Sequence, residues 1–291
     1  MAKRGGVVRR LLVPSDGSAD SDRAVDLAKR IALAQSAEII LARVAEPVAG
    51  SLASAGGEVN ADAYDHFSQS DDAHIMGELR SLADTFGLGS LAVRCLVLHG
   101  PIEQALLDCE RQQRPDLVVI ASHGRTGLAR LALGSVADRL VRDGASPVLV
   151  TPRSRGIITT PEHALVLLDG SAVAEHALPM VQEMAGRPLR RLVLFRSVRK
   201  EQDRSPATAY LEGIARRLDS SGARVEIVVD VAPDVRESVE QASATVDLII
   251  LCTHGRGGFS RLRHGSVAAH IMRAVSKPAL LVRAADILDT E

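Results

Sequence analysis

Two glycine-bearing stretches of the chain are suited to holding a phosphate group. Residues 123–137 read HGRTGLARLALGSVA and residues 254–268 read HGRGGFSRLRHGSVA, so ten of the fifteen positions are identical. Each stretch follows an apolar run typical of a buried strand, and each contains a Gly-Ser pair where a helix is expected to begin. Glycine allows the backbone to approach an anion closely, and the free N–H groups of a helix N-terminus donate to it. The pattern predicts a phosphate-binding loop in each half of the chain.

A second repeated element supplies a carboxylate. Asp16-Gly17-Ser18 follows a predicted strand in the first half, and Asp169-Gly170-Ser171 follows one in the second. Either aspartate could accept hydrogen bonds from ribose hydroxyls or from the amino group of a base. Each could equally serve as the cap of the helix that follows, because aspartate is favoured at that position.

The other polar residues of the loops allow more than one interpretation. Arg125 and Arg130 could supply positive charge to a phosphate or could lie in solvent. His123 and His254 have no second histidine, cysteine or carboxylate at ligand spacing, so we expect a role in the turn and no metal site. Gly134 and Gly265 could simply form tight turns. The chain has no G-x-x-x-x-G-K-[ST] loop and no G-x-S-x-G elbow, which counts against an enzyme.

The elements around these loops alternate between strand and helix, which is typical of a parallel sheet covered on both faces. We expect two domains, at residues 1–152 and 162–285, each with a five-stranded parallel sheet of strand order 3-2-1-4-5. Residues 45–72 have the composition of a long flexible insertion, with a helix following near 72–86. Pro179 predicts a kink or a late helix start. The last strands, 147–151 and 278–282, are expected to pack against each other.

Composition excludes several classes of protein. The chain has 291 residues with 35 Lys and Arg against 36 Asp and Glu, so no basic field would attract nucleic acid. It contains no run of 18 apolar residues, and we expect no membrane span. Its three cysteines have no metal-ligand spacing and fit buried thiols of a reduced compartment. These features predict a soluble cytoplasmic protein.

The repeated motif resembles that of the universal stress protein family, whose nucleotide-binding members carry G-x2-G-x9-G-[ST]. In the first half Ala121 and Gly124 precede Gly134-Ser135 at this spacing, and in the second half Cys252 and Gly255 precede Gly265-Ser266. The opening pattern V-P-x-D-G-S is also present at residues 13–18. The resemblance covers almost the whole chain as a tandem pair.

The resemblance implies two Rossmann-like α/β domains of the adenine nucleotide alpha hydrolase-like type. It further implies binding of ATP, or of ADP or AMP, together with Mg²⁺, in a non-catalytic stress-response sensor with a regulatory protein partner. Either a homodimer or a pseudo-symmetric monomer would fit it. Carried over to this chain, the implied binding residues are Pro14, Ser15, Asp16, Gly17, Val44, Ala121, His123, Gly124, Arg125, Gly134, Ser135 and Val136 in the first half, and Asp169, Gly170, Ser197, His254, Gly255, Arg256, Gly265, Ser266 and Val267 in the second.

The second half departs further from the family pattern than the first half does, which favours the first half as the binding site. Ala121 and Cys252 stand where the first glycine of the motif is expected, and cysteine is the larger of the two. Leu167 replaces the proline of the opening pattern in the second half. Two alternatives therefore stay open, a nucleotide-independent interaction module and a slow ATP hydrolase.

Overall fold

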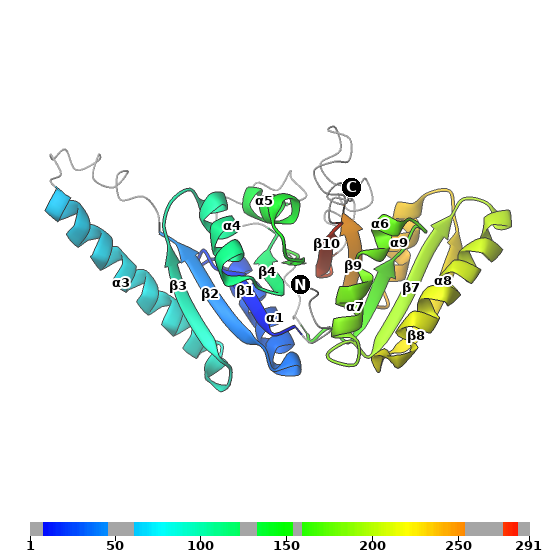
Figure 1. Ribbon diagram of the computed structural model, residues 1–291, viewed down its shortest axis with the longest axis horizontal. Coiled ribbons are helices and arrows are strands. Elements are labelled where there is room, and N and C mark those ends of the chain that lie inside the picture. The colour runs from blue at the N-terminus through cyan, green and yellow to red at the C-terminus, as the bar shows by residue number, and fades with distance from the viewer. Residues whose placement is uncertain (1–7, 46–60, 123–132, 154–158, 254–275, 285–291) are drawn as a thin grey trace, which may run out of the picture.

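The computed structural model describes residues 8–45, 61–122, 133–153, 159–253 and 276–284, and helices separate most of its consecutive strands (Figure 1). The elements of the first half are β1 (Arg10–Pro14), α1 (Ala19–Gln35), β2 (Glu38–Val44), α3 (Ala61–Thr85), β3 (Val93–Leu98), α4 (Ile102–Gln113), β4 (Leu117–Ala121), α5 (Ser135–Asp143) and β5 (Val148–Thr151). Those of the second half are β6 (His163–Leu167), α6 (Ala172–Glu175), α7 (Leu178–Met184), β7 (Arg191–Val198), α8 (Arg204–Leu218), β8 (Arg224–Val231), α9 (Val235–Ser243), β9 (Leu248–Thr253) and β10 (Ala279–Arg283).

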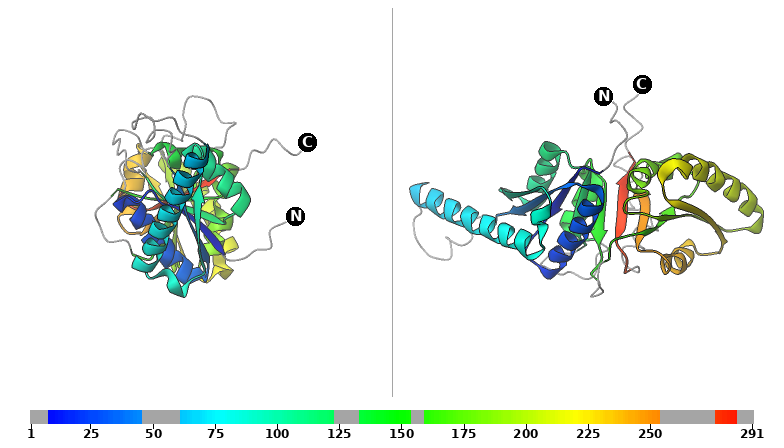
Figure 2. Two further views of the ribbon diagram at one scale, coloured as in Figure 1. Left: turned by 90° about the vertical axis from the view of Figure 1, so that its left-hand side faces the viewer. Right: turned by 90° about the horizontal axis from the view of Figure 1, so that it is seen from below.

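All ten strands form one sheet, in the order β3-β2-β1-β4-β5-β10-β9-β6-β7-β8. Each half therefore has the strand order 3-2-1-4-5, as predicted, and its own strands are parallel. The two halves meet where β5 pairs with β10 in antiparallel register, with Leu149 opposite Leu280. The predicted packing of the last strands is thus confirmed, and Figure 2 shows β10 beside the strands of the first half.

Helices cover both faces of the sheet because the strands are apolar on both sides. Leu11 and Val13 of β1 belong to the core cluster that also contains residues of α1, α3, α7 and α8. Leu12, between them, belongs to the opposite cluster with residues of α4, α5 and α9. Both clusters run through the two halves, so the chain has a continuous core across the junction.

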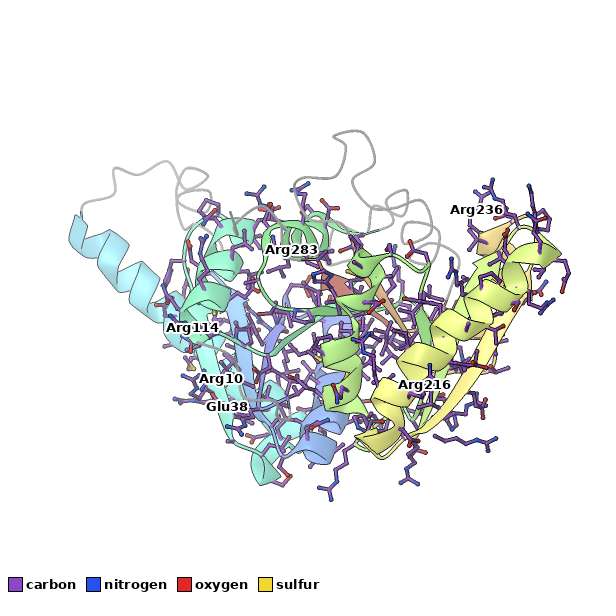
Figure 3. All side chains as sticks on the ribbon, turned by 45° about the vertical axis from the view of Figure 1, so that its right-hand side comes forward. Arg10, Glu38, Arg114, Arg216, Arg236 and Arg283 are labelled. Carbon is purple, nitrogen blue, oxygen red and sulfur yellow. The ribbon has the colours of Figure 1, made fainter. Side chains whose placement is uncertain are left out.

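Polar contacts reinforce the junction between the halves. The Gln35 side chain, 6 % exposed at the end of α1, donates to the backbone carbonyls of Glu183 and Arg187 in the second half. Arg283 of β10, which Figure 3 labels, donates from its guanidinium to the carbonyl oxygen of Arg142 at 3.3 Å. These bonds fix the two halves relative to each other in addition to the apolar contacts.

The region 45–72 differs from the expectation of a long flexible insertion. Helix α3 begins at Ala61, about three turns before the predicted start near residue 72, and continues to Thr85. Residues 61–72 contain no proline or glycine, and this lack of helix breakers outweighs their polar composition. Residues 46–60 lie outside the described part of the chain.

The expectation at Pro179 is confirmed. The helical segment after β6 is divided into α6, which ends at Glu175, and α7, which begins at Leu178. Pro179 lies in the first turn of α7, where its missing N–H has no intrahelical partner to lose.

A buried carboxylate secures the turn that leads into β5. Glu110 at the end of α4 is 2 % exposed, and its Oε1 accepts hydrogen bonds from the N–H groups of Ala145 and Ser146 at 2.8 and 2.6 Å. We expect Glu110→Ala to lower the free energy of unfolding by about 2 kcal/mol or more, because two backbone donors lose their partner. Urea denaturation measures the change, with Gln112→Ala on the exposed side of the same helix as the control. Equal stabilities of the two variants would contradict this role of Glu110.

Candidate nucleotide-binding clefts

The strand order brings the two repeated loops of each half together. Strands β1 and β4 are adjacent and parallel, with Leu12 opposite Val118, so their carboxyl ends lie at the same edge of the sheet. The chain leaves β1 toward α1 on one face and leaves β4 toward α5 on the other. Such a reversal of winding direction forms a crevice in which open α/β sheets bind ligands. Strands β6 and β9 repeat this arrangement in the second half.

The Asp-Gly-Ser turn has the same geometry in both halves. Asp16 Oδ1 accepts hydrogen bonds from the Ser18 backbone N–H at 3.0 Å and from its hydroxyl at 2.6 Å. Asp169 Oδ1 accepts from the Ser171 N–H at 2.8 Å. The helix caps are Ser18 and Ser171, so the aspartates are not themselves N-caps.

Glycine is required inside this turn. Gly17 has φ of 76° and Gly170 has φ of 91°, a conformation that side chains of L-residues rarely adopt. Ser15, next to Asp16, is 4 % exposed, and its N–H donates to the Ala42 carbonyl at 2.8 Å. The turn is therefore held against the end of β2 as well as against α1.

The Gly134-Ser135 pair begins α5 at the same edge. Gly134 adopts extended backbone, with φ of −66° and ψ of 161°, and its N–H donates to the Ser122 carbonyl at 2.7 Å. The N-cap of α5 is Gly134, which has no side chain to cap the helix, and the N–H groups of the first turn of a helix have no intrahelical partner. Ser135 is exposed and Val136 is half-buried against the core. The N-terminus of α5 therefore presents donors and a hydroxyl beside the end of β4.

Some of the remaining predicted site residues lie in the described part of the chain, and others lie outside it. Pro14, Val44 and Ala121 end β1, β2 and β4, so the structure brings them to the same edge as Asp16 and Gly134. Ser197 has in β7 the place that Val44 has in β2. The predicted residues that lie outside the described part of the chain are His123, Gly124, Arg125, His254, Gly255, Arg256, Gly265, Ser266 and Val267. Arg130 lies outside it as well.

Arg43, which was not among the predicted site residues, contacts Ser15, directly before the Asp16-Gly17-Ser18 turn. Arg43 is 9 % exposed, and its Nε donates to the Ser15 carbonyl at 3.1 Å. A terminal nitrogen of the same guanidinium pairs with the Glu78 carboxylate of α3. The side chain thus links the Ser15–Asp16 turn to the helix that covers the end of β2.

The second half has an arginine at the matching position, but its partner is a tyrosine ring and not a carboxylate. Arg196 follows Phe195 in β7 as Arg43 follows Ala42 in β2, and its guanidinium lies 5.3 Å from the ring centre of Tyr210 on α8. A Cβ atom added at Gly170 would come within 2.6 Å of this guanidinium. Both arginines could have been found in the sequence, because each lies at the matching position near the end of the second strand of its half.

The pair of Arg43 and Glu78 should contribute measurable coupling to stability. A double-mutant cycle with Arg43→Met and Glu78→Gln is expected to give about 1 kcal/mol, because the guanidinium is largely buried while the carboxylate is half exposed. The part-buried pair of Arg30 and Asp26, one turn apart on α1, is the control and should give about 0.4 kcal/mol, the usual value for an ion pair within one helix. Similar coupling energies for both pairs in urea denaturation would contradict this account.

The carboxylate of Asp22 lies near two other charged groups, the Asp16 carboxylate and the Arg43 guanidinium. Burial raises the pKa of Asp22 above its usual value; the Arg43 charge opposes this shift, and the Asp16 charge adds to it. Among the described residues no three of His, Cys, Asp and Glu gather as a metal site would require.

Cys252 occupies the second cleft at the end of β9. Burial raises the pKa of its thiol to about 11, and the Asp169 carboxylate adds to the shift. Burial likewise raises the pKa of Cys109 to about 11. The thiol, not the thiolate, is therefore the form present at neutral pH.

The raised thiol pKa values predict slow alkylation of the folded protein. At pH 8 the thiolate fractions of Cys109 and Cys252 are small, whereas an unperturbed cysteine with a pKa of about 8.5 is partly ionised. We expect labelling of both residues to accelerate as the pH rises toward 11, and to be rapid at pH 8 in urea. Iodoacetamide labelling followed by peptide mass spectrometry measures each rate. Fast modification of Cys252 in the folded protein at pH 8 would contradict the pKa assignment.

Comparisons with known proteins agree with the fold and the repeat. The model of the universal stress protein family matches residues 8–152 and 161–283. A universal stress protein of Mycobacterium tuberculosis H37Rv is 32 % identical over 192 residues, which cover 60 % of this chain and 64 % of that relative. One from Mycolicibacterium smegmatis is 26 % identical over 290 residues, covering 94 % of this chain and 96 % of that relative.

Solved structures show the same architecture. A universal stress protein from Archaeoglobus fulgidus has a TM-score of 0.71 at 15 % identity, covering 95 % of this chain and 98 % of its own. The described part of the chain therefore has the two-domain, Rossmann-like α/β fold of that protein. The match to the family model covers most of the sequence, and the chain belongs to the universal stress protein family.

Proposed function

We propose that the chain binds an adenine nucleotide, ATP or its products ADP and AMP, together with Mg²⁺, in the cleft of the first half. The observation that carries the proposal is the juxtaposition of the α5 N-terminus with the Asp16 turn at the carboxyl ends of β4 and β1. Anions are stabilised at helix N-termini by free N–H groups and by the helix dipole. The phosphates would lie at Gly134 and Ser135, and the nucleoside beside Asp16 and Val44.

The described residues fit such a ligand. The N-cap of α5 is Gly134, which carries no side chain that would compete with a phosphate for the first N–H groups of the helix. Asp16 Oδ1 already accepts two hydrogen bonds from Ser18, which hold its carboxylate in a fixed orientation. When bound, Mg²⁺ would neutralise phosphate charge beside the hydroxyl of Ser135.

The physiological role that we infer is that of a cytoplasmic, non-catalytic sensor or regulator in a stress response. The bound nucleotide would bias the conformation of the chain or its contact with a regulatory protein. None of the described helices is long and apolar enough to cross a membrane. The continuous core across β5 and β10 offers a physical route by which a change at one cleft reaches the other half.

A titration of nucleotide-free protein with Mg·ATP tests the proposal. We expect saturable heat of binding in calorimetry, and no accumulation of product when the same sample is followed by chromatography. Rapid metal-dependent turnover would instead favour the ATP hydrolase. An absence of binding with Mg²⁺ present would contradict the proposal and favour the nucleotide-independent interaction module.

A further inference from the structure

The outer strand of the second half leaves one edge of the sheet unpaired. Strand β8 is last in the sheet order, and among the described residues no strand lies on its outer side (Figure 1). None of its eight residues is buried, and Val228 is 39 % exposed. The free N–H and C=O groups of such an edge are a template for pairing with another strand.

The backbone groups on this free edge belong to alternate residues. The N–H of Arg224 donates to the Arg190 carbonyl of β7 at 2.8 Å, so the even-numbered residues of β8 face β7. The N–H and C=O groups of the odd-numbered residues, from Val225 to Val231, therefore point outward. The Val229 carbonyl accepts a hydrogen bond from the Arg204 guanidinium at 3.0 Å, and its second lone pair is left for a strand in the plane of the sheet.

One self-pairing register of this edge joins most of the strand and brings opposite charges together. In an antiparallel pair of two β8 strands, outward-pointing residues lie opposite outward-pointing residues. With Ile227 at the centre, Arg224 lies opposite Asp230 of the second copy, and this favourable pair occurs twice. A register centred on Glu226 would oppose two copies of Glu226, and one centred on Val228 would oppose Glu226 to Asp230. Registers shifted further pair less of the strand.

Helix α8 fits the same arrangement. It lies over β8 and runs antiparallel to it, with Arg204 at the level of Val229. Ile227 is two residues back along β8, about 6.6 Å, which corresponds to about four residues of helix, so Thr208 lies at its level. A two-fold axis at Ile227 would place the Thr208 side chains of both copies face to face, and Arg204 of each copy opposite Glu212 of the other.

The flank of α8 beside this edge is hollowed and has room for a second helix. The hollow has a volume of about 440 Å³ and is lined by Glu201, Arg204, Ser205, Thr208, Ala209 and Glu212. Helix axes pack about 8–10 Å apart, and the small side chains of Ser205, Thr208 and Ala209 allow such an approach.

The opposite edge of the sheet has no such self-complementarity. Strand β3 has six residues, and Arg94 is the only charged residue among them. An antiparallel pair of two β3 strands therefore contains no opposite charges. The two outer edges of the chain thus differ, and β8 is the one suited to a second copy.

We propose that β8 is a dimerisation edge, at which two copies of the chain pair antiparallel about Ile227 and pack α8 against α8. The contact uses the same surface of both copies, so it closes on itself as a two-fold dimer. The second strand would cover Val228 on one face of the sheet, and the second helix would fill the hollow of α8 on the other. The inference does not depend on nucleotide binding.

Charge reversal tests both the interface and its register. Sedimentation equilibrium of the full chain should give the mass of two chains. Asp230→Lys would oppose lysine to Arg224 at both ends of the paired strands, and should raise the dissociation constant of the dimer about tenfold or more. Arg224→Glu should have the same effect. The double variant restores opposite charges and should dimerise about as tightly as the wild type, which misfolding of the single variants would not produce.

Asp84→Lys is the matched control, because it makes the same change of charge at an exposed position near the end of α3. It should leave the dimer unchanged. The inference is overturned if the wild type has the mass of one chain at the highest concentration at which it stays in solution, or if it forms open-ended larger species. An unchanged dissociation constant for Asp230→Lys, or a double variant that dimerises no better than the single ones, would overturn it as well.

Discussion

Gly134→Asp is expected to weaken ATP binding in the first cleft about thirtyfold or more while leaving the domain folded. Gly134 has negative φ and extended ψ at the N-cap of α5, a backbone conformation that residues with a side chain adopt without strain. Aspartate is favoured at an N-cap and should satisfy free N–H groups of α5, so the helix is not weakened. The same carboxylate would lie where phosphate is proposed to bind. Repulsion of about 2 kcal/mol, half of the Coulomb energy of two charges 4 Å apart near a protein surface, gives this loss of affinity.

Gly134→Asn separates charge from size in this experiment. Asparagine caps a helix nearly as well as aspartate and has the same shape, but it carries no charge. Calorimetric titration should show a much smaller loss of affinity for Asn than for Asp, with equal thermal stabilities of the unliganded variants. Unchanged ATP affinity of a folded Gly134→Asp protein would show that the phosphates bind elsewhere.

Leu280→Ala is expected to lower the free energy of unfolding of the whole chain by about 2–5 kcal/mol. Leu280 of β10 is fully buried and lies opposite Leu149 of β5, at the antiparallel junction between the halves. Both leucines belong to the core cluster that runs through the two halves. The cavity left by alanine would therefore destabilise both domains. Urea denaturation followed by circular dichroism measures the change.

An exposed leucine provides the control for this prediction. Leu33 on α1 is 49 % exposed, and Leu33→Ala should change stability by less than about 0.5 kcal/mol. We expect wild type and Leu280→Ala to unfold in a single transition, since the core is continuous. If Leu280→Ala unfolded one half while the other kept its stability, the two domains would be independent and the junction would not couple them.

The architecture could be predicted from the sequence because its determinants are local and occur twice. Buried parallel strands read as apolar runs, and the repeated Asp-Gly-Ser turn marks the end of the first strand in each half. The pairing of β5 with β10 was predicted because these last strands would otherwise leave two apolar edges exposed. The start of α3 at Ala61 was missed, because the polar composition of residues 45–72 hides the lack of helix breakers after residue 60.

The parts of the site that could not be predicted depend on contacts distant in sequence. Arg43 meets Glu78 across 35 residues, and the register of β2 and the docking of α3 bring them together. Likewise, Ser197 and Ser238 are 41 residues apart and meet only when α9 packs over β7.

The most direct test of nucleotide binding is to purify the chain without added nucleotide, denature it, and quantify the released adenine nucleotides by chromatography. Our account predicts about one equivalent or more per chain, and less in Gly134→Asp protein prepared in the same way. Release of no nucleotide, together with no binding of ATP to the native protein in the presence of Mg²⁺, would contradict the account.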